Sequence, residues 1–169
     1  MNELEQKLAQ IEDFHFVHQN LFCSGQPCFE QFNLIKEYGV TTVLNLSTLK
    51  SLNQDQYCLD LGLNYIQIPF SKQLPTCDQA ILALDLIHYL SQNQIVWLFS
   101  EKNQIAACLI YLYRQYYLNI DLPTAQEQLH AIWQPDETWT GFIHAVALQL
   151  QGRQATAEIQ QTLLSNDEQ

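Results

Sequence analysis

The chain has 169 residues, of which 47% are hydrophobic and 15% are charged, and its formal net charge is -11. A chain of this length can bury the hydrophobic core of one domain, and this composition argues against intrinsic disorder. Because 18 Asp and Glu outnumber seven Lys and Arg, the surface should repel nucleic acids and anionic membranes, so we expect neither as a partner.

The cytoplasm is the expected location. No apolar run approaches the roughly 20 residues that a helix needs to span a bilayer. The segment from Met1 to Lys7 is acidic and polar, unlike a secretory signal. The cysteines are odd in number and lack CxxC spacing, which is typical of reduced thiols. They are Cys23, Cys28, Cys58, Cys77 and Cys108.

A zinc site is the alternative for some of these cysteines. His15, His18, Cys23 and Cys28 lie close together in sequence, and all four are possible zinc ligands. Their spacing matches no zinc module, and core packing explains the cysteines more simply. We therefore expect neither a metal nor a cofactor.

The first half of the chain alternates between helical and extended patterns. Ser51 and Gln54 match a capping box, and Gly39 is placed to end a helix. In chain order we predict a helix over 2–11, strands at 14–16 and 21–23, a helix over 29–38, a strand over 40–46, a helix from 51 to about 62 and a strand over 63–70.

The second half continues the alternation. Thr76 with Gln79, and Thr124 with Glu127, match capping boxes that open helices. Residues 95–99 form a continuous apolar run, which predicts a central strand buried on both faces. Further helices are predicted over residues 105–118, 137–150 and 154–164.

Alternating strands and helices indicate an α/β fold with a central, mostly parallel sheet flanked by helices. We expect one domain over residues 1–164 and a frayed tail over 165–169. Ligands of such folds bind beyond the carboxyl ends of the strands. The polar turn 100–104 joins the most buried strand to the most buried helix, so backbone amides and a helix N-terminus should point at this turn.

Several segments around this turn resemble a bacterial family of protein-tyrosine-phosphatase-like proteins related to dual-specificity phosphatases. The likeness extends from about Asn20 to Ile143 and rests on the order of its pieces rather than on any one of them. The pieces are Ser24-Gly-Gln-Pro27, Gly39-Val-Thr-Thr-Val-Leu-Asn-Leu46, Leu61-Gly-Leu-Asn-Tyr-Ile-Gln-Ile-Pro69, Pro75-Thr76, Tyr111-Leu-Tyr-Arg114, Ile132-Trp-Gln-Pro135, Trp139 and Phe142-Ile143.

The resemblance implies a site at which this chain departs from active relatives. These carry His-Cys-x-x-Asn-x-Arg, or Gly in place of Asn, after the central strand. Here Phe99 replaces the histidine, Ser100 replaces the nucleophilic cysteine, and Ile105 replaces the arginine, or Ala106 if the gap is one residue longer. Asn103 agrees with the pattern. The acidic position after Ile-Pro aligns with Ser71.

These departures predict a catalytically inactive phosphatase-fold protein, a pseudophosphatase rather than an enzyme. A serine is a weak nucleophile without a base, and Ile105 cannot clamp phosphate. The remnant phosphate loop comprises Ser100, Glu101, Lys102, Asn103, Gln104 and Ile105. We expect a binding or scaffold module with an unknown protein partner, and a homodimer through the C-terminal region is possible. The alternative is an active tyrosine- or dual-specificity-type phosphatase, or another hydrolase, that uses rearranged residues such as Ser100.

Overall fold

The computed structural model describes residues 3–48 and 53–167. The elements, in chain order, are α1 (Glu3–Leu8), β1 (His15–His18), β2 (Leu21–Ser24), α2 (Phe29–Glu37), β3 (Thr42–Asn45), α3 (Gln54–Asp60), β4 (Asn64–Gln67), α4 (Cys77–Ser91), β5 (Val96–Phe99), the 3-10 turn η1 (Glu101–Asn103), α5 (Gln104–Tyr116), α6 (Leu122–His130) and α7 (Glu137–Asp167).

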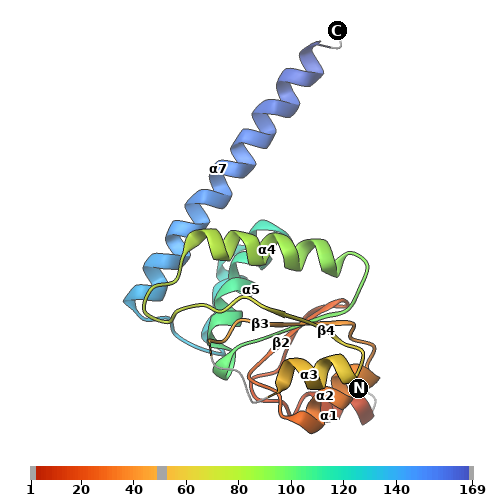
Figure 1. Ribbon diagram of the computed structural model, residues 1–169. Coiled ribbons are helices and arrows are strands. Elements are labelled where there is room, and N and C mark those ends of the chain that lie inside the picture. The colour runs from red at the N-terminus through yellow and green to blue at the C-terminus, as the bar shows by residue number, and fades with distance from the viewer. Residues whose placement is uncertain (1–2, 49–52, 168–169) are drawn as a thin grey trace.

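Within these residues, five strands form one sheet in the order β1-β2-β5-β3-β4. All neighbouring pairs are parallel except β1 with β2, which is antiparallel. Helices cover both faces of the sheet (Figure 1). The predicted α/β class with a mostly parallel sheet is therefore confirmed.

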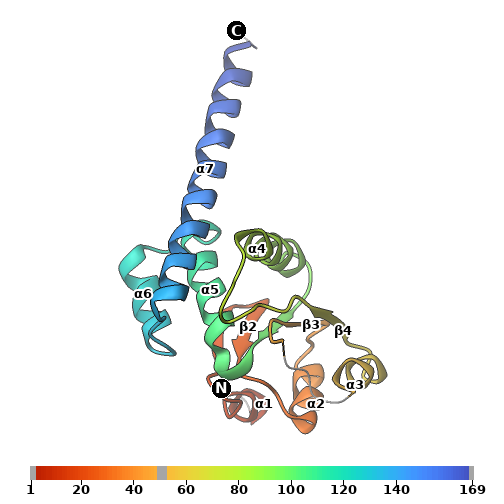
Figure 2. The same cartoon turned by 60° about the vertical axis from the view of Figure 1, so that its left-hand side comes forward.

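Strand β5 lies at the centre of the sheet, and every one of its residues is buried. Because side chains alternate along a strand, Trp97 and Phe99 pack with α1, α2 and α3, whereas Val96 and Leu98 pack with the helices from α4 onward. Figure 2 shows the two groups of helices on opposite sides of the sheet. The prediction that residues 95–99 form a strand buried on both faces is confirmed.

Two helix starts were predicted with different success. Thr76 caps α4 as predicted, because its Oγ1 accepts a hydrogen bond from the amide of Gln79. Helix α6 begins earlier than predicted: Asp121 is its N-cap and accepts the amide of Thr124, and Pro123 occupies the first turn. An aspartate followed by proline near the first turn is a strong start signal. The predicted cap at Ser51 lies outside the described residues.

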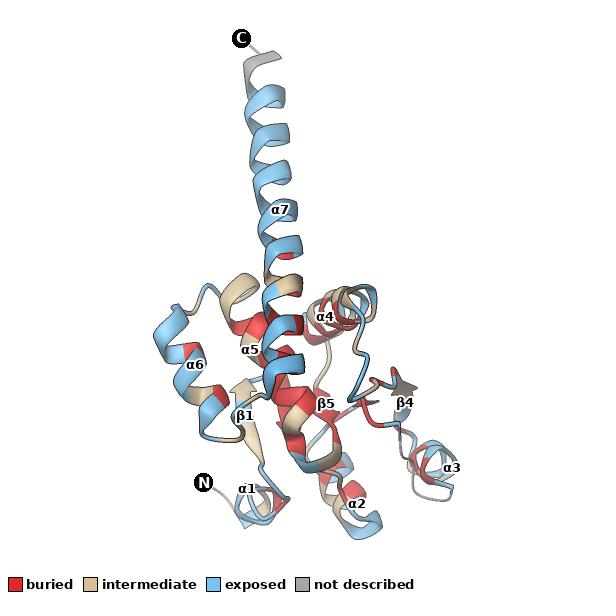
Figure 3. Ribbon diagram, turned by 90° about the vertical axis from the view of Figure 1, so that its left-hand side faces the viewer, coloured by how far each residue is buried: buried red, intermediate tan, exposed pale blue. Residues whose placement is uncertain are grey.

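The C-terminal region forms one helix, α7, of 31 residues, so the prediction of two helices was wrong. A glycine inside a helix costs only about 1 kcal/mol relative to alanine, so Gly152 does not end it. The first half of α7 is held to the body by Trp139, Val146 and Leu150, all buried. Its second half projects beyond the body (Figure 1), and Figure 3 colours that half as exposed.

None of the described helices is long and apolar enough to cross a membrane. The frayed tail over residues 165–169 stays a prediction, because 168 and 169 lie outside the described residues, although α7 itself runs to Asp167.

Candidate functional site

The turn after β5 lies at the carboxyl end of the central strand, directly before the N-terminus of α5. Ser100 is fully buried and has extended backbone angles. Lys102 and Asn103 then adopt left-handed conformations, with φ of 51° and 53°. Two successive left-handed residues reverse the chain within one turn, so that α5 can begin at Gln104. In this geometry the amide of Ala106, in the first turn of α5, points back toward Ser100.

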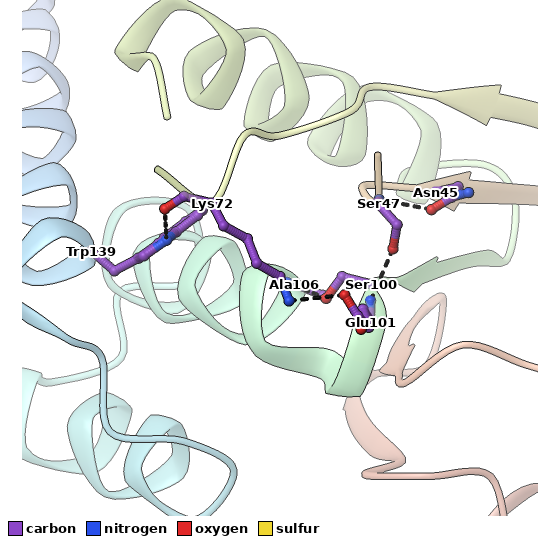
Figure 4. Close-up of polar contacts among 7 residues, drawn as sticks. All are labelled: Asn45, Ser47, Lys72, Ser100, Glu101, Ala106 and Trp139. Atoms are coloured by element: carbon purple, nitrogen blue, oxygen red, sulfur yellow. Dashed lines mark hydrogen bonds and ion pairs between the residues drawn. The ribbon is translucent and has the colours of Figure 1, made fainter. Parts of the chain in front are cut away.

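Hydroxyl groups of two serines accept backbone amides of this turn (Figure 4). The amide of Ala106 donates to Ser100 Oγ at 3.0 Å, and the amide of Glu101 donates to Ser47 Oγ at 2.9 Å. Ser47 is buried at the end of β3, and its own amide donates to Asn45 Oδ1 at 2.8 Å. The turn is therefore held in shape by side chains from the two adjacent central strands.

An ion pair crosses the rim of the turn. Lys72, from the segment after β4, lies 2.8 Å from a carboxylate oxygen of Glu101. The hydrogen bond from Lys72 and its charge lower the pKa of Glu101. The carbonyl of Lys72 accepts a hydrogen bond from Trp139 Nε1 at 3.0 Å, which links this rim to α7 (Figure 4). Lys102 is exposed at the same turn.

Three of the predicted site residues, Phe99, Ile105 and Ser71, make packing or loop contacts within the chain. Phe99 is buried and its ring meets that of Phe32 edge-on, with centroids 5.9 Å apart. Ile105 is buried in the core cluster on the α4 to α7 side of the sheet. Ser71 Oγ accepts the amide of Leu74, so it shapes the loop before α4.

Asn103 ties the turn to the N-terminal segment. Its Nδ2 donates to the carbonyl of Asp13 at 2.7 Å and lies 3.6 Å from the sulfur of Cys23. Its Oδ1 is buried and has no partner among the described residues. Asp13 and Ser47 are contacts that sequence reasoning missed, because each lies more than 50 positions away from the turn residue it touches.

The three histidines on helices contact other parts of the molecule. Ser100 Oγ accepts a hydrogen bond from the amide of Ala106, and an N–H donor cannot take the proton of the hydroxyl group. His88 contacts the hydroxyl of Tyr113 at 3.4 Å, and His130 and His144 line a surface pocket between α6 and α7. Burial raises the pKa of the Cys108 thiol far above its ordinary value, so this cysteine stays a protonated core side chain.

Cys23, on the neighbouring strand β2, brings its sulfur into contact with Asn103 of the turn. Burial raises the pKa of Cys23 to about 11, although the hydrogen bond from Asn103 and the charge of Arg114 oppose that shift. Its thiol is therefore protonated at neutral pH and is a poor nucleophile. The described residues contain no cluster of three or more side chains suited to hold a metal, and Cys28 is exposed whereas Cys23 is buried.

No family model and no curated protein matches the chain by sequence. Solved structures do match. A phosphatase-assigned DUF442 protein from Shewanella putrefaciens superposes with a TM-score of 0.75, at 21% identity over 86% of this chain and 97% of that chain. The core catalytic domain of the PP-IP phosphatase Siw14 from Saccharomyces cerevisiae, in complex with citrate, gives 0.70 at 19% identity over 79% and 85%.

A cysteine-to-serine variant of TpbA from Pseudomonas aeruginosa, in complex with phosphotyrosine, gives a TM-score of 0.68 at 13% identity over 82% of this chain and 90% of that chain. These neighbours contradict the expectation that the chain is not an enzyme, because they include a catalytic domain of the same fold. That expectation was inferred from the residue types at four positions, Phe99, Ser100, Ile105 and Ser71, and it was wrong. The chain has the protein-tyrosine-phosphatase-like fold, with its serine-containing turn at the end of the central strand.

Proposed function

We propose that the chain is a phosphatase-fold protein that binds a phosphate monoester at residues 100–105. The observation that carries this proposal is the position of Ser100. Its Oγ lies between the end of β5 and the start of α5 and takes an amide hydrogen bond from that helix. A helix N-terminus of this kind favours an anion, because the helix dipole places partial positive charge there. The amides of Glu101 and Ala106 already have serine acceptors, so an anion would have to share or displace these hydrogen bonds.

Local charge supports an anionic ligand in an otherwise acidic chain. Lys72 and Lys102 both lie at this turn, although the chain has only seven Lys and Arg in all. A bound phosphate would compete with Glu101 for Lys72. With lysines rather than an arginine fork, the charge interaction lacks bidentate geometry, so we expect weak, high-micromolar affinity.

The comparisons support the choice of ligand. TpbA was crystallised with phosphotyrosine as a cysteine-to-serine variant, and Siw14 with citrate, which is another anion. With a serine at this turn, we expect a phosphate ester to stay bound for longer before any cleavage, since a hydroxyl is a much weaker nucleophile than a thiolate.

Hydrolysis of the bound ester is the second candidate function, and the phosphatases among the structural neighbours favour it. Ser100 Oγ would bond to phosphorus as the bond to the leaving oxygen breaks, and its proton would pass through water to that oxygen. A second water would then attack phosphorus, release inorganic phosphate and return a proton to Ser100 Oγ. Because Ser100 has an amide rather than a base as its hydrogen-bond partner, we expect turnover far slower than that of a thiolate enzyme.

Calorimetric titration with phosphotyrosine and with inorganic phosphate tests the binding proposal. Saturable binding is expected for the natural chain and should be lost in Ser100→Ala and weakened in Lys102→Gln. Lys7→Gln on α1 removes the same charge far along the chain and serves as the matched control. A natural chain that binds neither ligand contradicts the proposal.

Turnover of a chromogenic aryl phosphate tests the hydrolytic candidate separately. Turnover that disappears in Ser100→Ala would assign the reaction to this turn. Turnover that persists in Ser100→Ala would rule out Ser100 as the attacking group, and binding without turnover would leave the first proposal standing alone.

A further inference from the structure

The second half of α7 exposes apolar side chains that nothing in the described chain covers. Residues 151–165 are all exposed, and Leu148, Ile159 and Leu163 are 68%, 61% and 60% exposed. Figure 3 shows this half of the helix as an exposed rod that leaves the body. An isolated helical segment of this length is marginal in water, so its stability calls for a surface that packs against it.

The exposed apolar residues follow the spacing of a helix–helix seam. Leu148, Gly152, Ala155 and Ile159 are separated by steps of four, three and four residues, which places them on one face of α7. Leu163 follows beside that face. We call these five residues the α7 stripe. Such spacing fits a partner helix lying along α7 rather than a small molecule.

Glycine occurs on this face although nothing within the chain needs it. A Cβ atom at Gly152, or at Gly141 on the same side, would meet no heavy atom within 4 Å. Glycine inside a helix is destabilising relative to alanine, and no contact within the chain requires a glycine at position 152. Close approach of the backbone of a second helix would explain why position 152 is a glycine.

Charge favours a second copy of the chain over a basic or acidic partner. Between residues 138 and 166 the charged residues are Arg153 and Glu158, which cancel, whereas the whole chain carries -11. Two acidic chains would therefore meet with least repulsion along α7. Arg153 is already paired with Asp85 of α4, at 3.0 Å, which keeps it at the side of the stripe.

The stripe is also complementary to itself. When two α7 helices lie antiparallel with a two-fold axis between residues 153 and 154, Leu148 of each copy faces Ile159 of the other. In the same register Gly152 faces Ala155, so small residues meet at the centre, where the backbones come closest. An isologous interface needs one surface that matches itself under two-fold rotation, and the four stripe residues from Leu148 to Ile159 do so, while Leu163 faces His144 of the other copy.

We propose that the chain forms a two-fold dimer in which the α7 stripes of two copies pack antiparallel. Sedimentation analysis or light scattering of the full chain at high-micromolar concentration should give twice the chain mass of 19.6 kDa. Added salt should strengthen the dimer, because it screens the repulsion between two acidic bodies.

Ile159→Glu should weaken the dimer by about tenfold or more. Gln161→Glu, two residues further along and on the opposite side of the helix, adds the same charge and should leave the mass unchanged. Gly152→Leu should separate the copies without unfolding the chain, since the added side chain meets open space within one copy. Circular dichroism of each variant verifies that α7 remains folded.

A monomeric natural chain overturns the proposal. So do equal masses for Ile159→Glu and Gln161→Glu, because the stripe would then not be the interface. A natural chain that stays monomeric but captures another protein through Ile159 would assign the stripe to a different partner and would also overturn it.

Discussion

At the scale of single residues, the turn after β5 depends on the hydroxyl groups of two buried serines. Ser100 accepts the amide of Ala106 and Ser47 accepts the amide of Glu101. Both serines are buried, so water cannot take over as acceptor when the hydroxyl is removed. The same atom of Ser100 therefore has a structural role and a proposed ligand-binding role.

Ser100→Ala should lower the free energy of unfolding by about 1–3 kcal/mol, because it leaves a buried amide without an acceptor. Ser71→Ala is the matched control: Ser71 Oγ also accepts an amide, that of Leu74, but this hydrogen bond is exposed and water can replace it. Urea unfolding of both variants measures the difference. Equal losses would show that the Ala106 amide finds another acceptor.

A second residue-scale prediction concerns His18, which is half-buried and stacks on the ring of Tyr113 with centroids 6.1 Å apart. Burial lowers the pKa of His18 below its ordinary value of 6.5, and the charge of His88 lowers it further. The unfolded state therefore binds a proton at a higher pH than the folded state. The stability that neutral His18 contributes is fully present above about pH 6.5, and it is lost as the pH falls from there through the folded pKa.

His18→Gln should flatten this loss of stability between neutral and mildly acidic pH. His144→Gln, an exposed position on α7, is the control for a general effect of removing a histidine. Thermal unfolding followed across the pH range provides the measurement. A profile that has the same slope in His18→Gln as in the natural chain would contradict the prediction.

At the scale of elements, local sequence signals predict strands and helices well but predict their continuity less well. The apolar run 95–99 and the Thr76 cap were sufficient for β5 and α4. The break predicted near Gly152 did not occur, because the flanking Gln, Ala and Leu residues favour helix and no proline interrupts them. Periodicity within a short window cannot tell one long helix from two.

The site shows a similar division between local and tertiary information. The strand, turn and helix around Ser100 are contiguous in sequence, so their order could be predicted. The acceptor at Ser47 and the contact of Asn103 with Asp13 could not, since they arise when β3 and the N-terminal segment pack beside the turn. Tertiary contacts of this kind leave no periodic pattern in the sequence.

Trp139 is the element-scale anchor of α7. Its ring packs against Phe142 with centroids 5.0 Å apart, and its Nε1 bonds the carbonyl of Lys72. Trp139→Ala should lower the free energy of unfolding by about 3–5 kcal/mol, the usual cost of removing a buried indole. Trp139→Phe should cost less, because it retains part of the packing and loses the hydrogen bond.

Gln149→Ala, at an exposed position of the same helix, should change the free energy of unfolding by less than about 0.5 kcal/mol and is the control. Guanidinium unfolding compares the three variants. If Trp139→Ala and Gln149→Ala unfold alike, α7 is not anchored to the body through its first turns.

At the scale of the whole molecule, stability and self-association should be separable, because the buried residues of α7 lie at or before Leu150 whereas three of the five stripe residues lie beyond Gln154. Among the α7 side chains that the structure describes, Leu150 is the last buried one. Arg153 still bonds Asp85, and Gln154 Nε2 bonds the carbonyl of Tyr116 at 3.3 Å. Residues 155–165 are exposed and contribute the Ala155, Ile159 and Leu163 part of the stripe.

A chain that ends after Gln154 should therefore keep the body intact and lose the dimer. At low concentration its thermal midpoint should lie within about 2 °C of that of the full chain, since no buried contact is removed. At higher concentration the midpoint of the full chain should rise, because association stabilises the folded state, while that of the shortened chain should not. Calorimetry at several concentrations tests both statements. A shortened chain that melts far lower at every concentration would show that the projecting segment stabilises the body itself.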